Sequence, residues 1–360
     1  MSADPSFVDP FNRAPGEPLV VAVTVPFPPD PTLQERLSEH VDDVEVHFTP
    51  YNESRDARAA RGANGGALPE GIETPTVDEA TLEIWRGAHV LVGLDLPPDP
   101  AMLPNLKWFQ TISAGIDQVD CTQLATMGAR LSSASGIASA SIAEFVMARL
   151  LEVWKSLREI ERHQRKQTWN ETFGTEVGGR SILIVGLGSI GRQIARRARA
   201  FDLHVIATRS SAQPGDVDPD VDELHPASSL GVLLPGADAV VCALPTSPAT
   251  LDLFDADMFA LMRSDAIFCN VGRGTLVVES DLIAALERGH LRAAVLDVMR
   301  NEPLPANDPL WTAPRIYLSP HSAVSLDRYQ QNAWTILADN LASFLRGHRL
   351  NNEIEIELTA

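Results

Sequence analysis

The sequence contains very little cysteine. Its three cysteines, Cys121, Cys242 and Cys269, lie far apart in 360 residues and form no CxxC or Cys/His pattern. This scarcity argues against a disulfide framework and against a structural zinc, so we expect no metal site. Free cysteines of this kind are typical of a reducing compartment, and we expect a cytoplasmic protein.

Positively charged residues are outnumbered. The chain has 29 Lys and Arg against 48 Asp and Glu, which gives a formal net charge of −19 at pH 7. Nucleic-acid binding needs a basic surface, so we expect no nucleic-acid partner. No apolar run approaches eighteen residues, and the first thirty residues lack a basic segment followed by an apolar stretch. A membrane span and a secretory signal are therefore not expected. An anionic substrate would have to be held by a local positive site against the overall field.

Short apolar segments recur along the chain and alternate with helical patterns. Such alternation predicts an α/β protein with parallel sheets, and 360 residues are enough for two domains. The predicted strands are residues 19–25, 44–48, 89–94, 106–112, 181–185, 205–207, 239–243, 266–271, 293–298 and 316–318. Helices are predicted at residues 77–86, 142–165, 280–289 and 329–347. We expect two Rossmann-like or flavodoxin-like domains separated by a cleft.

The domains are predicted to be discontinuous in sequence. Residues 1–137 and 325–360 would form a substrate-binding domain, because the last helix is expected to pack back on the first domain. Residues 138–324 would form the dinucleotide-binding domain, because they contain the glycine-rich sequence GLGSIG (186–191) between a strand and a helix. Residues 54–71 have no apolar periodicity and predict a mobile surface loop, with a substrate lid as the alternative.

A glycine-rich loop follows the strand at residues 181–185. The segment ILIVGLGSIGRQIARRARA has the order strand, GxGxxG, amphipathic helix, which is typical of a dinucleotide-binding site. Gly186 would permit the tight turn, Gly188 would let the backbone approach the pyrophosphate, and Gly191 would let helix and strand pack closely. The helix N-terminus would offer N–H groups to the phosphates.

The next strand bears on the choice of cofactor. NAD binders carry an acidic residue about twenty positions beyond the loop, where this chain has Arg209 followed by Ser210 and Ser211. A guanidinium can bind a 2′-phosphate through two hydrogen bonds. We therefore predict that NADP(H) is preferred and that NAD(H) is possible; a solvent-facing Arg209 with relaxed cofactor choice is the alternative.

Three polar residues follow late strands, where ligands of α/β sheets bind. Arg273 could grip a substrate carboxylate and polarise a carbonyl. His321 could supply a proton at neutral pH, and Glu302 could bond the other imidazole nitrogen and favour its charged form. Each residue alone has a structural explanation, but together they form the set that reduction of a 2-oxo acid requires.

Several ordered motifs now suggest a family. They are TISAGID (111–117), GLGSIG (186–191), ALPTSPAT (243–250), NVGRGTLV (270–277), LDV (296–298), EPLP (302–305) and SPH (319–321). With these motifs the chain resembles the D-isomer-specific 2-hydroxyacid dehydrogenases from about Val90 to His321. The EPLPANDPLW segment and Arg209 are most similar to glyoxylate/hydroxypyruvate reductases. The first ninety residues match weakly, and residues 51–71 are longer than the family's usual connection.

The resemblance implies roles for particular residues. Arg273, Glu302 and His321 would be the catalytic residues. The backbone of Ala114 and Gly115 would hold the substrate carboxylate together with Arg273, with Leu94 nearby. Asp297 would bond the nicotinamide carboxamide. The other residues implied to line the cofactor are Ser189, Ile190, Leu244, Pro245, Val271 and Gly272.

The function expected is an NADP(H)-preferring reduction of small 2-oxo acids, such as glyoxylate or hydroxypyruvate, to D-2-hydroxy acids. One alternative is an NAD-linked D-3-phosphoglycerate dehydrogenase; Arg209 opposes it, and only about forty residues follow His321, too few for a regulatory domain. Another is a dinucleotide-sensing interaction protein of the corepressor type on the same fold. A homodimer is expected from the resemblance and from the long helix at 142–165, which needs a covering partner.

Overall fold

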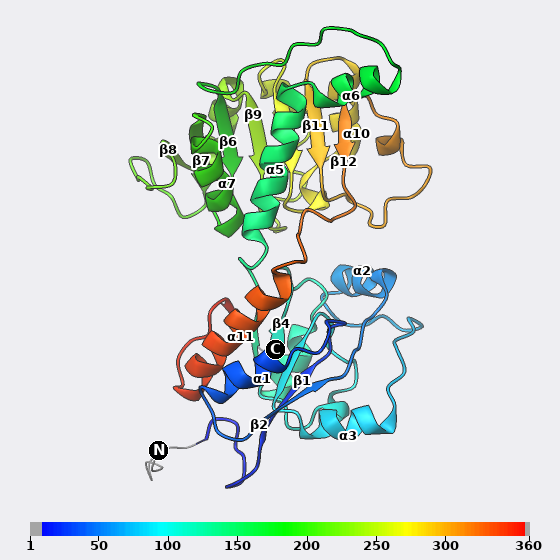
Figure 1. Ribbon diagram of the computed structural model, residues 1–360, viewed down its shortest axis with the longest axis vertical. Coiled ribbons are helices and arrows are strands. Elements are labelled where there is room, and N and C mark those ends of the chain that lie inside the picture. Colours follow the sequence, from blue (N-terminus) through cyan, green and yellow to red (C-terminus); the bar gives the residue numbers. More distant parts are fainter. Residues whose placement is uncertain (1–8, 357–360) are drawn as a thin grey trace. The chain divides into compact units, whose positions relative to one another are not determined.

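The computed structural model describes residues 9–356, and the chain forms two compact units. Unit 1 joins the residues up to Ile137 to those from Leu326 onward, and unit 2 runs from Ala138 to Ser325. The outer bounds of the predicted domains, at residues 1 and 360, lie outside the described residues. Figure 1 shows that each unit consists of a β-sheet with helices packed against it.

Unit 1 is built on a six-stranded sheet in the order β13-β5-β4-β3-β1-β2. All neighbouring strands are parallel except β13, which pairs antiparallel with β5. Its strands are β1 (Leu19–Val23), β2 (Val44–Phe48), β3 (Val90–Gly93), β4 (Trp108–Thr111), β5 (Arg130–Ser132) and β13 (Glu353–Ile354). The order 2-1-3-4-5 is flavodoxin-like, and the strand order reverses between β1 and β3.

Helices cover both faces of the unit 1 sheet, which explains why its central strands β1 and β3 are apolar throughout. The helices are α1 (Pro31–Ser38), α2 (Arg55–Ala63), α3 (Glu79–Gly87), α4 (Cys121–Met127), α11 (Tyr329–Leu345) and the 3₁₀ turn Pro100–Met102. α1 and α11 pack on one face through residues such as Leu33 and Trp334. α3 and α4 pack on the other through Trp85 and Leu124.

Unit 2 is built on a seven-stranded parallel sheet in the order β12-β11-β10-β9-β6-β7-β8. The strands are β6 (Ser181–Val185), β7 (His204–Arg209), β8 (Glu223–Pro226), β9 (Ala239–Cys242), β10 (Ile267–Asn270), β11 (Ala293–Leu296) and β12 (Ile316–Leu318). This is the order of a dinucleotide-binding Rossmann sheet, which reverses between β6 and β9.

The helices of unit 2 also lie on both faces of their sheet. They are α5 (Ser139–Trp154), α6 (Leu157–Arg165), α7 (Ser189–Arg199), α8 (Leu230–Leu233), α9 (Ala256–Leu261) and α10 (Glu279–Glu287), with 3₁₀ turns at 227–229, 234–236, 274–276 and 309–311. α5 and α7 share one core with alternate residues of the strands, and α8 to α10 share the other. The predicted pair of parallel-sheet α/β folds is confirmed.

The prediction of a mobile loop at residues 54–71 is wrong, because this segment contains helix α2. Ser54 caps the helix by accepting a hydrogen bond from the Ala57 N–H, at 3.0 Å. The buried side chains of α2 are Ala57 and Arg61, which are four residues apart and share one face. A buried arginine replaces the usual apolar residue, so the sequence lacks the periodicity that indicates a helix.

The predicted helix at residues 142–165 is two helices. α5 ends at Trp154, and Ser156 adopts a left-handed backbone with φ of 54° before α6 begins. The apolar face of α5 is covered within unit 2, where Val146 and Leu150 are fully buried in the core that α7 also lines. The argument that α5 needs a partner chain to cover it therefore fails.

Candidate functional site

The glycine loop lies between β6 and α7, at the point where the strand order of unit 2 reverses. A Cβ on Gly191 would lie 2.2 Å from the carbonyl oxygen of Gly186, so only glycine lets the helix approach the loop this closely. Gly186 has φ of 107°, a conformation that favours glycine. A Cβ on Gly188 would meet no atom within 4 Å, which leaves open space beside the first turn of α7.

The first turn of α7 supplies anion-binding groups to that open space. Ser189 is exposed and Ile190 is half-buried at the helix start. The first N–H groups of any helix have no partner within the helix, and the helix dipole adds partial positive charge there. Together with the bare backbone at Gly188, this arrangement fits a dinucleotide pyrophosphate.

Two arginines, one at the carboxyl end of β7 and one from α7, contact a half-buried carboxylate. Arg209 ends the strand, and its Nη1 donates to Oδ2 of Asp218 at 3.4 Å, while no hydrogen bond within residues 9–356 reaches its buried Nε. Asp218 also accepts two hydrogen bonds from Arg192 of α7, at 2.7 and 2.8 Å. Ser210 follows Arg209 and is exposed. Two arginine side chains therefore converge where the ribose of a dinucleotide would end.

The predicted cofactor-lining residues after β9 and β10 lie against the glycine loop. Leu244 follows β9, and a Cβ on Gly186 would come within 2.8 Å of its side chain. A Cβ on Gly272 would lie 2.5 Å from the carbonyl oxygen of Leu244, so these two loops are packed together. Pro245 is exposed and Val271 is buried beside them.

His321 and Glu302 form a hydrogen-bonded pair. His321 lies in the loop after β12, and its Nδ1 is 2.7 Å from Oε2 of Glu302. The other carboxylate oxygen of Glu302 accepts the Met299 N–H at 2.9 Å, which fixes the carboxylate. The hydrogen bond to Glu302 raises the pKa of His321, and it outweighs the opposing effect of partial burial. With Nδ1 engaged, Nε2 is the nitrogen left to exchange a proton with a ligand.

Arg273 lies directly after β10 in a turn that buried groups hold in place. The buried side chain of Asn270 accepts the Gly272 N–H at 3.0 Å and donates to the carbonyl oxygen of Arg273 at 2.8 Å. A Cβ on Gly274 would lie 2.0 Å from the backbone of Met299, so this turn packs against the loop that leads to Glu302. The positive charge of Arg273 acts to lower the pKa of His321, against the larger effect of Glu302.

Asp297 is buried at the end of β11 and connects to the same loop. Its Oδ1 accepts the backbone N–H groups of Ser322 and Ala323, at 2.9 and 3.1 Å. Its carbonyl oxygen accepts the His321 N–H at 2.9 Å. His321 has φ of 54°, and these three hydrogen bonds hold its backbone in that left-handed conformation. Asp297 thus positions His321, a role that the sequence did not reveal.

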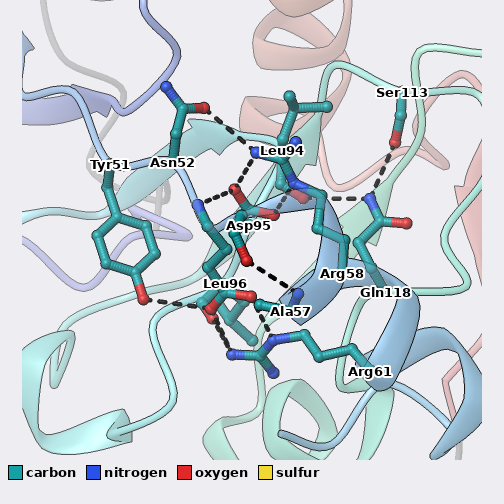
Figure 2. Close-up of polar contacts among 12 residues, drawn as sticks. Tyr51, Asn52, Ala57, Arg58, Arg61, Leu94, Asp95, Leu96, Ser113 and Gln118 are labelled. Atoms are coloured by element: carbon teal, nitrogen blue, oxygen red, sulfur yellow. Dashed lines mark hydrogen bonds and ion pairs between the residues drawn. The ribbon is translucent and has the colours of Figure 1, made fainter. Parts of the chain in front are cut away.

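The predicted substrate-binding residues of unit 1 form their own group, at the carboxyl ends of β3 and β4. Leu94 follows β3 and is half-buried, and Ala114 is exposed after β4. The side chain of Gln118 donates to the carbonyl oxygen of Leu94 at 3.2 Å and to Oγ of Ser113 at 3.3 Å (Figure 2). Within residues 9–356, no hydrogen bond engages the N–H groups of Ala114 and Gly115. Unengaged backbone N–H groups are what a loop needs in order to bind an oxyanion.

Among residues 9–356, no group of three or more His, Cys, Asp or Glu side chains is arranged to hold a metal ion. Over the same residues, no helix combines the length and the apolar character that crossing a membrane requires.

Comparison with known proteins decides the family. Residues 147–323 match the family model of the D-isomer specific 2-hydroxyacid dehydrogenase, NAD binding domain. The chain is 32% identical over 286 residues to glyoxylate/hydroxypyruvate reductase B of Escherichia fergusonii, a match that covers 76% of this chain and 87% of that protein. The chain belongs to the D-isomer-specific 2-hydroxyacid dehydrogenase family.

Solved structures of D-2-hydroxyacid dehydrogenases resemble this chain over nearly its whole length. A family protein from Aeromonas salmonicida is 27% identical, with a TM-score of 0.73, covering 95% of this chain and 100% of that chain. An NADPH-dependent glyoxylate/hydroxypyruvate reductase from Sinorhizobium meliloti, solved with NADP and sulfate, is 25% identical with a TM-score of 0.68, covering 93% and 98%. The predicted family is thereby confirmed, and the chain is an NAD(P)-dependent dehydrogenase.

Proposed function

We propose that this dehydrogenase is a cytoplasmic, NADP(H)-preferring reductase of small 2-oxo acids, of the glyoxylate or hydroxypyruvate type, that forms D-2-hydroxy acids. The observation that carries the proposal is the His321–Glu302 pair, with its 2.7 Å hydrogen bond, beside the Arg273 turn at the carboxyl ends of unit 2 strands. A charged imidazole next to an arginine is suited to a substrate that carries both a carboxylate and a ketone.

In the proposed mechanism, Arg273 binds the substrate carboxylate and polarises the ketone; in unit 1, the N–H groups of Ala114 and Gly115 are proposed to bind a carboxylate. The nicotinamide, when bound, supplies the hydride that is added to C2. His321 donates the proton on Nε2 to the ketone oxygen, which becomes the hydroxyl, and Glu302 stabilises the imidazolium before that transfer. Asp297, through its hold on the His321 backbone, keeps the imidazole directed toward its partner, and it is our candidate acceptor for the nicotinamide carboxamide.

The preference for NADP(H) rests on Arg209 and its neighbours. A 2′-phosphate would accept hydrogen bonds from Arg209, whose own contact with Asp218 is long at 3.4 Å, and from the exposed Ser210. The buried Nε of Arg209, which no group within residues 9–356 engages, is consistent with a ligand at this place. The Sinorhizobium meliloti relative, described as NADPH-dependent, supports the same preference. NAD(H) remains usable in this proposal, because the 2′-phosphate adds only part of the binding energy.

We further propose a homodimer formed through unit 2. The segment that follows α6 carries two exposed aromatic residues, Trp169, which is 96% exposed, and Phe173, which is 82% exposed. Leu157 and Ile160 of α6 are also exposed. The segment is anchored at its far end, where the Thr175 N–H donates to the carbonyl oxygen of Trp154 at 2.6 Å. Two large aromatic side chains on an anchored arm are suited to insertion against a second copy of the chain.

Initial rates with NADPH and NADH across glyoxylate, hydroxypyruvate, pyruvate and phenylpyruvate test the proposal. We expect the highest kcat/KM with NADPH and either glyoxylate or hydroxypyruvate. His321→Ala should lose about 10²- to 10⁴-fold in kcat, the usual contribution of a general acid. Near-wild-type turnover of that variant would show that His321 is not the proton donor. Strict NADH use with phosphorylated substrates would instead favour the phosphoglycerate dehydrogenase alternative.

A further inference from the structure

Arg58 of α2 lies at the point where the strand order of the unit 1 sheet reverses. Ligands of open α/β sheets bind beyond the carboxyl ends of the strands at this point. Here β1 and β3 lie side by side, and Leu94 and Asp95 follow β3 directly. Nε and Nη2 of Arg58 donate to the two carboxylate oxygens of Asp95, at 2.6 and 2.7 Å (Figure 2).

The pairing with Asp95 uses only one edge of the Arg58 guanidinium. Asp95 is fully buried, whereas the Arg58 side chain remains 26% exposed. Nη2 also lies 3.4 Å from Oδ1 of Asn52. Within residues 9–356, no hydrogen bond engages Nη1 of Arg58. The structure thus fixes the guanidinium in one orientation and leaves the two N–H groups of Nη1 without a partner among the described residues.

The second arginine of α2 is used differently. Arg61 is only 1% exposed, and its side chain forms two hydrogen bonds with the carboxylate of Glu53 at 2.7 Å. It also donates to the carbonyl oxygens of Gly66 and Leu96, at 2.9 and 3.1 Å. Arg61 therefore anchors the helix, because all three of its nitrogens are bonded inside unit 1.

Charge at this place is balanced pair by pair. Asp95 neutralises Arg58, and Glu53 neutralises Arg61. A second carboxylate or a phosphate on the substrate would gain little from a guanidinium that already holds a carboxylate, and it would lie near two buried anions. A neutral acceptor such as a hydroxyl can accept from Nη1 without that repulsion.

Contacts connect Arg58 to the loop that we assign to the substrate carboxylate. Asp95 is the neighbour of Leu94, whose carbonyl oxygen accepts from Gln118 at 3.2 Å. Gln118 also donates to Ser113, and Ser113 donates to the carbonyl oxygen of Gly115 at 2.5 Å. α2 packs on the same loop, since a Cβ on Gly62 would lie 3.7 Å from Cβ of Asp117.

We propose that Arg58 is a specificity-determining residue that donates a hydrogen bond from Nη1 to a hydroxyl on C3 of the substrate. The 2-oxo acid that fits best is then a 3-hydroxy-2-oxo acid, with its carboxylate on the loop at Ala114 and Gly115. This inference rests on the proposed function and names the substrate class within it. Asp95 is a positioning residue, because it acts by fixing the Arg58 guanidinium.

The test compares hydroxypyruvate with pyruvate, which differ only by the C3 hydroxyl. Arg58→Lys keeps a positive charge beside Asp95 and removes the planar fork. We expect it to lower the ratio of kcat/KM for hydroxypyruvate to that for pyruvate by about tenfold, mainly through KM, because the contact is already present in the bound substrate. Asp95 also accepts the Glu53 N–H at 3.0 Å. The double variant Arg58→Met/Asp95→Asn, which removes both charges and keeps an acceptor for that N–H, should lower the ratio similarly.

Arg61→Lys is the matched control. It alters another ion pair of helix α2, and that ion pair is buried and so cannot contact the substrate. We expect it to lower the melting temperature and to leave the hydroxypyruvate-to-pyruvate ratio within twofold of the wild-type value. An unchanged ratio in folded Arg58 variants of an active enzyme would overturn the inference, as would an equal shift in Arg61→Lys. Failure of the wild-type protein to reduce glyoxylate, hydroxypyruvate and pyruvate would instead overturn the proposed function, and the inference with it, whereas reduction of glyoxylate alone would overturn only the inference.

Discussion

Two glycines of the dinucleotide loop are predicted to affect different properties when each is replaced by alanine: Gly191 the stability of the fold, and Gly188 the affinity for the cofactor. Gly191→Ala would place Cβ 2.2 Å from a backbone oxygen, and a backbone atom cannot turn aside as a flexible side chain can. We expect overpacking to cost about 3 kcal/mol, the upper part of the usual range. The better helix propensity of alanine offsets about 1 kcal/mol of this cost. The net loss of about 2 kcal/mol corresponds to a melting temperature lower by roughly 4–8 °C for a unit of this size.

Gly188→Ala should leave the fold almost unchanged. Its Cβ would meet no atom within 4 Å, and the backbone angles φ −87° and ψ −160° are accessible to alanine. Alanine restricts the unfolded chain, which stabilises by about 0.4–1 kcal/mol. It is a poorer helix N-cap than glycine, which costs a similar amount, about 0.5–1 kcal/mol. The two effects nearly cancel, and the new methyl group lies where the pyrophosphate is expected to approach.

Thermal unfolding without cofactor and fluorescence titration with NADPH separate the two effects. Gly188→Ala should unfold within about 2 °C of the wild-type protein, because its net stability change is close to zero. It should bind NADPH about tenfold more weakly or worse, a loss of about 1.4 kcal/mol. Wild-type NADPH affinity in folded Gly188→Ala would refute our placement of the pyrophosphate. An unchanged melting temperature in Gly191→Ala would refute the packing argument.

Three further changes have expected outcomes. Glu302→Gln removes the carboxylate that raises the pKa of His321. Reduction needs the protonated imidazole, so activity is lost as the pH rises through that pKa. In a pH–rate profile, kcat/KM of this variant should therefore fall at a lower pH than kcat/KM of the wild type. Arg209→Asp should raise KM for NADPH by about 10- to 100-fold, the value of a hydrogen bond to a charged group, and should reverse the cofactor preference in initial-rate assays. The double variant Trp169→Ser/Phe173→Ser should convert the dimer to a monomer in light-scattering measurements at micromolar concentration.

Each of these has a control or a contrary result. For the pH profile, an unchanged fall in Glu302→Gln would show that the pair does not set the catalytic pKa. For cofactor choice, Arg199→Asp makes the same charge change at an exposed position at the end of α7 and should keep the NADPH preference. For assembly, a wild-type protein that is already monomeric would contradict the proposed dimer.

Much of the fold could be predicted because its strands are short, apolar and separated by helical patterns. The β6–loop–α7 segment was fully specified by its glycines and its apolar strand. β8 was not predicted, because an edge strand with the sequence ELHP carries charge and a proline and has no apolar run. α2 was missed for a different reason, since its buried face contains Arg61, whose burial is tolerable only through its pairing with Glu53.

The candidate site was predictable where residues directly follow strands. Arg273 and His321 could be placed in this way, since parallel strands bring their carboxyl ends to one edge of a sheet. Asp218 could not be placed, because it reaches Arg209 only through the path of the loop between β7 and β8. Arg58 of α2 was likewise hidden, since its partner Asp95 is 37 residues away, in the loop after β3.

The central claim is tested most directly by following hydroxypyruvate reduction and product together. Purified protein would be mixed with NADPH and hydroxypyruvate, NADPH loss measured by absorbance, and the product separated on a chiral column. We predict one D-glycerate formed for each NADPH consumed, with both quantities lost together in His321→Ala. Tight NADPH binding without turnover of any 2-oxo acid would contradict the account and would favour a dinucleotide-sensing protein on this fold.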